Sequence, residues 1–110
     1  MSNLDTAAIE MLKTVMEDDF AMLLDTFFED SLQRIADLKR HVNDRDPEAF
    51  RKTAHSLKGS ASNLGALTMT QLCLQAEEMG MASNLDGAEN LVSEIDREYH
   101  AVSRKLETFR

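Results

Sequence analysis

The sequence predicts an all-α fold: an up-and-down antiparallel four-helix bundle with a short extra helix at the N-terminus. Apolar residues recur every three or four positions in five segments, which is the period of helices with one buried face. Four glycines and one proline are too few for the frequent turns of a β-sandwich or barrel. A hydrophobic content of 43% also excludes a disordered chain. We expect a single domain over residues 1–110, because this length suffices for one core and not for two.

The first two helices are predicted over residues 6–17 and 20–42, with Asp5 as the N-cap of the first. The acidic pair Asp18-Asp19 separates them and suits a helix start. The second helix has an apolar stripe of Leu24, Phe28, Ser31, Ile35, Leu38 and Val42. Its first half is apolar on another side as well, through Phe20, Leu23 and Phe27. These three residues must be covered by the first helix or offered to a partner, so we regard them as docking candidates.

The third helix is predicted over residues 47–64, since Asp46 is a good N-cap and Pro47 suits the first helical position. Gly65 is predicted to end it in a left-handed conformation. The fourth helix is expected to end before Gly80. The fifth is expected to begin near Asp86, with Glu89 three residues later in a capping-box relation, and to continue to residue 109. Short connections between long helices favour antiparallel neighbours.

The charge balance restricts the classes of partner. Twelve basic residues against 20 acidic ones give a net charge of −8, which disfavours nucleic acid and anionic membranes because both are polyanions. No apolar run approaches the ~20 residues that span a bilayer, and the N-terminus lacks the pattern of a signal peptide. The single cysteine cannot form an internal disulfide, so we expect a cytoplasmic protein. A monomer is expected, because the bundle closes without a second copy.

The third predicted helix carries a histidine opposite its own apolar stripe. The helical period places these residues on that outer face: Glu48, Arg51, Lys52, His55, Lys58, Gly59 and Ser62. No Asp or Glu occurs from residue 49 to residue 76. An exposed imidazole beside an ammonium group suits a nucleophile with a cation that steadies an incoming anion. The alternative is that central helices are simply short of charge.

The run from Ala54 to Ala61, Ala-His-Ser-Leu-Lys-Gly-Ser-Ala, followed by Asn-Leu-Gly-Ala at 63–66, resembles a known signature. It is similar to the His-x-x-Lys-Gly-[Ser/Ala] motif of histidine-containing phosphotransfer (HPt) domains. The resemblance implies a four-helix-bundle fold and a protein that passes phosphoryl groups between receiver-domain aspartates in a multistep phosphorelay. Because the chain begins with Met1 and contains no receiver or ATP-binding domain, we expect a free-standing protein, although a domain trimmed from a hybrid sensor kinase would have the same sequence. The implied partners are the receiver domains of hybrid sensor kinases and of response regulators.

The resemblance also implies a role for each matching residue. His55 would be phosphorylated through Nε2, Lys58 would help to hold the phosphoryl oxygens, and Gly59 would let the receiver approach. Glu77 would accept a hydrogen bond from the other ring nitrogen. The supporting residues are Ser60, Ser62, Arg51 and Lys52; Ser60, with Ala61, would let neighbouring helices pack closely. The protein would need no cofactor of its own, because the receiver would supply Mg²⁺ and the acidic pocket.

Three functional hypotheses remain open on the sequence. The first is a phosphorelay intermediate, which would not be an ATP-dependent kinase because no phosphate-binding glycine loop is present. The second is a binding module that sequesters a receiver without phosphoryl transfer. The third is a helical scaffold without phosphoryl chemistry. The donor kinase, the acceptor regulator, the process that they control and the net direction of transfer cannot be read from one sequence.

Overall fold

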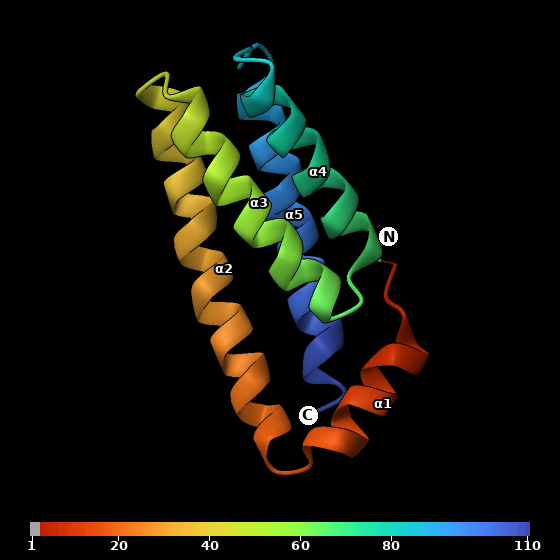
Figure 1. The fold of residues 1–110 in the computed structure, drawn as a ribbon. Helices are drawn as coiled ribbons and strands as arrows, with labels where there is room; N and C mark the ends of the chain where they lie inside the picture. Colours follow the sequence, from red (N-terminus) through yellow and green to blue (C-terminus); the bar gives the residue numbers. More distant parts are fainter. Residues whose placement is uncertain (1–2) are drawn as a thin grey trace.

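A computed structural model describes residues 3–110, and five α-helices account for most of them (Figure 1). The helices are α1 (Thr6–Met16), α2 (Asp19–Asn43), α3 (Pro47–Asn63), α4 (Leu67–Met81) and α5 (Ala88–Glu107). Within this part of the chain the only β-type pairing is an isolated bridge between Leu4 and Ala66. The prediction of an all-helical protein is therefore confirmed.

The four longer helices lie side by side and run in alternating directions (Figure 1). Each packs against two others: α3 against α2 and α4, and α5 also against α2 and α4. The short α1 contacts α2 and lies at the end of the molecule where the C-terminus is found (Figure 1). The N-terminal segment is attached to the α3–α4 connection, where the Asp5 N–H donates to the Gly65 carbonyl at 2.8 Å.

Most helix boundaries follow the caps in the sequence. The carboxylate of Asp5 accepts a hydrogen bond from the Ala8 N–H, and that of Asp46 accepts one from the Ala49 N–H, each at 3.1 Å. Gly65 follows α3 with a φ of +66°, the left-handed conformation expected of a glycine that ends a helix. These local signals therefore determine where α1 and α3 begin and where α3 ends.

Three predicted boundaries differ from the structure. The fifth helix begins at Ala88 after Gly87, whose φ is +83°, and no side chain caps it. The predicted capping box does not form, because the Asp86 N–H donates to Asn84 Oδ1 in the preceding turn at 3.0 Å. This helix also ends at residue 107, before the predicted 109. Gly80 lies inside α4, one residue before its end at Met81, and faces α3; its φ is not positive, unlike that of Gly65.

The contact between α3 and α4 is close because small residues lie in it. Ala54 and Ala61 of α3 and Cys73 and Ala76 of α4 are fully buried. A Cβ built on Gly80 would lie 2.7 Å from Arg51 Cβ and 2.8 Å from the Pro47 carbonyl oxygen. The two backbones could not approach this closely with a larger residue at position 80. The close contact determines which α4 side chains reach the outer face of α3.

Among the helices of residues 3–110, none combines the length and the apolar character needed to cross a membrane.

Candidate functional site

His55 lies in the middle of α3 with its side chain 63% exposed. The burial of Ala54 and Leu57 determines this orientation, because successive helical positions differ by about 100°. The helical period thus turns the imidazole outward while its neighbours pack in the core. The predicted exposure of this histidine is confirmed.

Glu77 of α4 links His55 to Lys58. Its Oε2 lies 2.8 Å from His55 Nδ1, and its Oε1 accepts a hydrogen bond from Lys58 Nζ at 2.6 Å. The Glu77 side chain is only 10% exposed, and that of Lys58 is 27% exposed. The Lys58 hydrogen bond is the main cause that holds the pKa of the Glu77 carboxyl below its ordinary value. Burial opposes this lowering of the pKa, and the hydrogen bond with His55 adds to it.

This geometry determines which nitrogen of a neutral His55 carries the proton. An ionised carboxylate can only accept hydrogen bonds, so the proton between His55 and Glu77 belongs to Nδ1. In a neutral ring, Nε2 then keeps its lone pair. No hydrogen bond of the described residues involves this Nε2, and the side chain is mostly exposed. The imidazole therefore presents Nε2 as a nucleophile, and the hydrogen bond from Nδ1 to Glu77 sets the tautomer of the ring.

In the described part of the chain, the other predicted residues of the face make no hydrogen bond or ion pair with this group. Arg51 donates two hydrogen bonds to Glu48, at 2.9 and 3.0 Å. The ammonium group of Lys52 lies 4.0 Å from the same carboxylate. A Cβ built on Gly59 would meet no described atom within 4 Å outside its chain neighbours and the nearby backbone of α3, so the surface beside His55 is open at that point. Ser62 is exposed.

Ser60 lies toward α2. Its hydroxyl donates to the Ser56 carbonyl one turn earlier at 3.3 Å, and the side chain is half-buried. The adjacent Ala61 is fully buried, as expected of a small residue in the helix contact.

Two of the three predicted docking residues are wrong. Phe20 is 2% exposed and Phe27 is 5% exposed, so both belong to the core. Phe27 packs in a T-shaped arrangement on Phe28 and also lies near Tyr99 of α5, with ring centroids 5.9 and 6.2 Å away. This second apolar side of α2 is therefore covered from within the molecule. Only Leu23 is partly exposed, beside a hollow of about 110 Å³ between α2 and α3.

The sequence did not reveal the ion pair between Lys58 and Glu77, since the spacing of residues on separate helices does not indicate contact. It also did not reveal the role of Gly80 in the close approach of α3 and α4. A signal for this second feature does exist. Cys73, Ala76 and Gly80 place small residues on one face of α4 at helical spacing.

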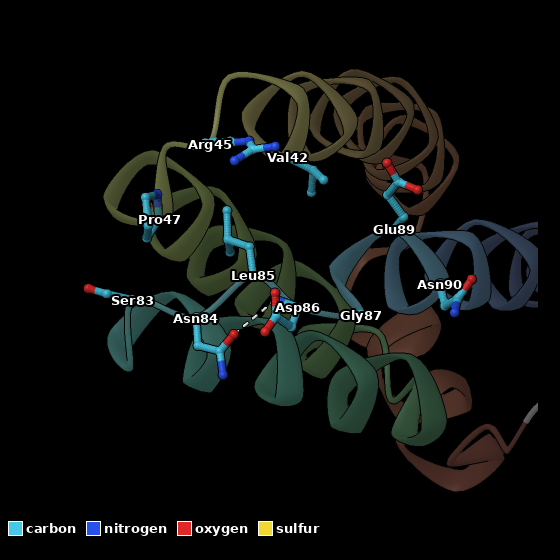
Figure 2. A pocket seen from close by; sticks show the side chains of 10 residues that line it. All are labelled: Val42, Arg45, Pro47, Ser83, Asn84, Leu85, Asp86, Gly87, Glu89 and Asn90. Atoms are coloured by element: carbon cyan, nitrogen blue, oxygen red, sulfur yellow. Dashed lines mark hydrogen bonds between the residues drawn. The ribbon is translucent and has the colours of Figure 1, made fainter.

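A second hollow lies away from the histidine. Figure 2 shows it between the α2–α3 and α4–α5 connections, at the other end of the molecule from α1. Its volume is about 660 Å³. None of its ten lining residues belongs to the outer face of α3. In residues 3–110 there is no group of three or more His, Cys, Asp or Glu side chains that could hold a metal ion.

Comparison with known proteins identifies relatives of most of the chain. Residues 22–105 match the Hpt domain family. A histidine-containing phosphotransfer protein 2 of Arabidopsis thaliana is 32% identical over 103 residues, which cover 87% of this chain and 66% of the plant protein. The chain thus spans slightly less than two thirds of the length of this curated relative.

Solved structures agree with this match. The crystal structure of histidine-containing phosphotransfer protein B from Pseudomonas aeruginosa PAO1 has a TM-score of 0.92 and 36% identity. The comparison covers 96% of this chain and 91% of the bacterial one. A maize histidine-containing phosphotransfer protein shares the fold, with a TM-score of 0.82 and 21% identity over 92% of this chain and 84% of its own. The chain belongs to the Hpt domain family of histidine-containing phosphotransfer proteins.

Proposed function

We propose that this protein is a phosphorelay intermediate in which His55 accepts a phosphoryl group from the aspartate of one receiver domain and passes it to another. One observation carries the proposal: an exposed imidazole is held through Nδ1 by the ionised carboxylate of Glu77, at 2.8 Å. This bond leaves Nε2 with a lone pair on the open side of α3. We take the framework to be an up-and-down antiparallel four-helix bundle with α1 across one end.

The transfer balances without movement of a proton. The Nε2 lone pair attacks the phosphorus of the aspartyl phosphate, an Nε2–P bond forms, and the P–O bond to the aspartate breaks. The leaving electron pair stays on the aspartate carboxylate. Nδ1 keeps its proton, so the phosphorylated ring is formally cationic, and the Glu77 carboxylate lies against that positive charge. Transfer to a second receiver reverses these steps.

The receiver is proposed to complete the active site. Mg²⁺ bound by the receiver would neutralise the charge of the transferring phosphoryl oxygens. The open surface at Gly59 gives the receiver aspartate access to Nε2. Each partner therefore holds half of the reacting groups, and phosphoryl transfer requires the complex.

We further propose that the protein works as a monomer in the cytoplasm. A second copy on the outer face of α3 would compete with the receiver for His55. The lone cysteine, Cys73, is buried, and burial raises the pKa of its thiol to about 12, so it is an unreactive thiol suited to a reducing compartment.

The test is transfer from a phosphorylated receiver, followed by measurement of acid-labile, base-stable phosphate on this protein. We expect the wild type to be labelled and His55→Gln to remain unlabelled. His100→Gln is the matched control, since His100 is also exposed but lies on α5. Label on His55→Gln would contradict the proposed site. A wild type that binds receivers tightly and is never labelled would instead support sequestration without transfer.

A further inference from the structure

The connection between α1 and α2 departs from helical geometry at a single residue. Glu17 has a φ of +51° and a ψ of −118°, whereas Asp18, with a φ of −65° and a ψ of −22°, is already in the helical region. The Glu17 N–H donates to the Lys13 carbonyl at 2.9 Å, which is the bond that it would make inside a continuous helix. A rotation of the Glu17 backbone is therefore enough to join α1 and α2 into one helix from Thr6 to Asn43.

The bend at Glu17 is unfavourable for this residue type. Its angles are those of the first central position of a type II′ turn, which favours glycine because a Cβ crowds the backbone there. Neither glycine nor proline occurs between residues 6 and 43, so the sequence contains no residue that enforces a break. The side chain of Asp18 makes no cap hydrogen bond to α2. Tertiary contacts therefore maintain the bend against the local preference of the chain.

The apolar stripe continues through the bend without a change of side. At about 100° per residue, Ile9 and Leu12 of α1 and Phe20 and Phe27 of α2 fall on one side of a straight helix. In the bent chain the same four residues belong to the core, with Leu12 partly buried and the other three buried. The pattern thus suits one long amphipathic helix as well as two shorter ones.

Few contacts hold α1 on its own bundle. In the structure of residues 3–110, Ile9 is the one residue of α1 that is buried. The segment before α1 is attached to the α3–α4 connection, where the Asp5 N–H donates to the Gly65 carbonyl at 2.8 Å. The Leu67 N–H donates to the Asn3 carbonyl at 2.9 Å. These contacts lie toward the N-terminal end of α1, away from the bend, so the end of another copy offers the same partners.

We propose that α1 exchanges between two copies of this chain, with Glu17 as the hinge. In the exchanged dimer each α1 continues α2 as a straight helix and covers the end of the other copy, with the contacts that it makes in the monomer. A helix from Thr6 to Asn43 is about 57 Å long, and the monomer measures 42 Å in its longest dimension. The straightened α1 therefore projects beyond its own bundle. Relief of the backbone strain at two hinges favours the dimer over two bent monomers.

The apolar character of α1 determines which partner it takes. Ile9 and Leu12 lie on the core side of this helix, and Met11 and Val15, on the opposite side, are 70% and 74% exposed in the monomer. Release of α1 exposes the core side of the helix to water and uncovers the end of its bundle. A second copy in the same state supplies a vacated end for this helix and a released helix for this end.

The exchange leaves the outer face of α3 open. Within residues 3–110, no hydrogen bond or ion pair joins residues 3–16 to that face. His55 is therefore exposed in each copy of the dimer, as it is in the monomer. The monomer is the form expected at low protein concentration, and the exchanged dimer is a second state that forms at high concentration.

The hinge is tested by light scattering after size-exclusion chromatography, with protein refolded from urea at a high and at a low concentration. We expect the wild type to form dimers at the high concentration. Glu17→Gly relieves the strain of the bend and weakens a continuous helix, so the dissociation constant of its dimer should rise at least tenfold. Glu17→Ala, the matched control, removes the same carboxylate but keeps a Cβ, so its dimer should be at least as stable as that of the wild type.

Two results of this measurement would overturn the proposal. One is equal dissociation constants for the dimers of Glu17→Gly and Glu17→Ala, because the strain would then have no part in the association. The other is a monomer alone in both the wild type and Glu17→Ala at the high concentration.

A disulfide trap distinguishes exchange from ordinary association. Leu4 and Ala66 form an antiparallel bridge, in which the Cβ atoms are close enough for a disulfide. The variant combines Leu4→Cys and Ala66→Cys with Cys73→Ala, which removes the thiol of the natural chain. After oxidation, we expect linked pairs of chains from the dimer fraction and single chains from the monomer fraction on a denaturing gel. A dimer fraction that yields only single chains contains no exchanged α1, and this result would overturn the proposal.

Labelling with phosphoramidate, a small molecule whose P–N bond breaks as ammonia leaves, tests whether the outer face of α3 stays open. We expect the isolated dimer and the monomer to be phosphorylated on His55 at the same rate per copy. A dimer that is labelled much more slowly than the monomer would contradict an exchange confined to α1. Absence of label on both forms would contradict the proposed function alone, since the disulfide trap decides the exchange without any phosphodonor.

Discussion

Replacement of Gly59 by alanine should stabilise the fold and slow phosphoryl transfer from a receiver. Gly59 lies inside α3, where glycine costs about 1 kcal/mol relative to alanine. Apart from its chain neighbours and the nearby backbone of α3, a methyl group at this position meets no described atom within 4 Å, so no packing cost opposes the gain in helix propensity. We expect the free energy of unfolding to rise by about 1 kcal/mol, which moves a urea midpoint by about 0.5 M.

Gly80→Ala is the matched control, because the same substitution there should have the opposite sign. Its Cβ would lie 2.7 Å from Arg51 Cβ, 2.8 Å from the Pro47 carbonyl oxygen and 2.9 Å from Arg51 Cα. Two of these three atoms are backbone and cannot move without separating α3 from α4. Overpacking of this kind costs about 1–3 kcal/mol, which offsets or exceeds the gain in helix propensity. We expect a lower urea midpoint than that of the wild type.

Gly59→Ala, the more stable of the two variants, should be the one that is impaired in phosphoryl transfer from a receiver. The methyl group of Gly59→Ala lies beside His55 on the face that we propose the receiver approaches, so we expect transfer to slow at least tenfold. Phosphorylation by phosphoramidate, which needs little room, should stay within twofold of the wild type. Urea unfolding and the two labelling rates test the reasoning. A destabilised Gly59→Ala, or one that takes phosphate from a receiver at the wild-type rate, would refute it.

Three further predictions concern stability. Ser31→Ala should stabilise the protein by about 1 kcal/mol in urea unfolding, because the buried Ser31 hydroxyl has no hydrogen-bond partner within residues 3–110; a loss of stability would reveal one. Leu57→Ala should cost about 2–5 kcal/mol, since Leu57 is fully buried; a midpoint near wild type would contradict its place in the core. The lowered pKa of Glu77 predicts extra stability above its ordinary value of 4.5 and loss of it below. The difference from Glu77→Gln should therefore shrink as pH falls from 5 to 3, and a constant difference would contradict the ion pair with Lys58.

The sequence by itself determined the helices and the exposure of the histidine. Asp46, Pro47 and Gly65 mark the ends of α3 through local backbone chemistry, which acts in any surroundings. The apolar stripe of α3 then requires His55 to point outward, because residues on opposite faces of a helix cannot both be buried in one core. The start of α5 was missed because a left-handed glycine and an Asn84 turn compete with the expected cap there.

Only the tertiary structure decided which side chains meet across helices. Helical periodicity determines the residues that share a face, but the rotation and sliding of one helix against another depend on the summed packing of all of them. The small residues of α4 bring it close to α3, and this register places Glu77 between Lys58 and His55. Packing of the same kind buries Phe20 and Phe27, which the sequence alone allowed to face a partner.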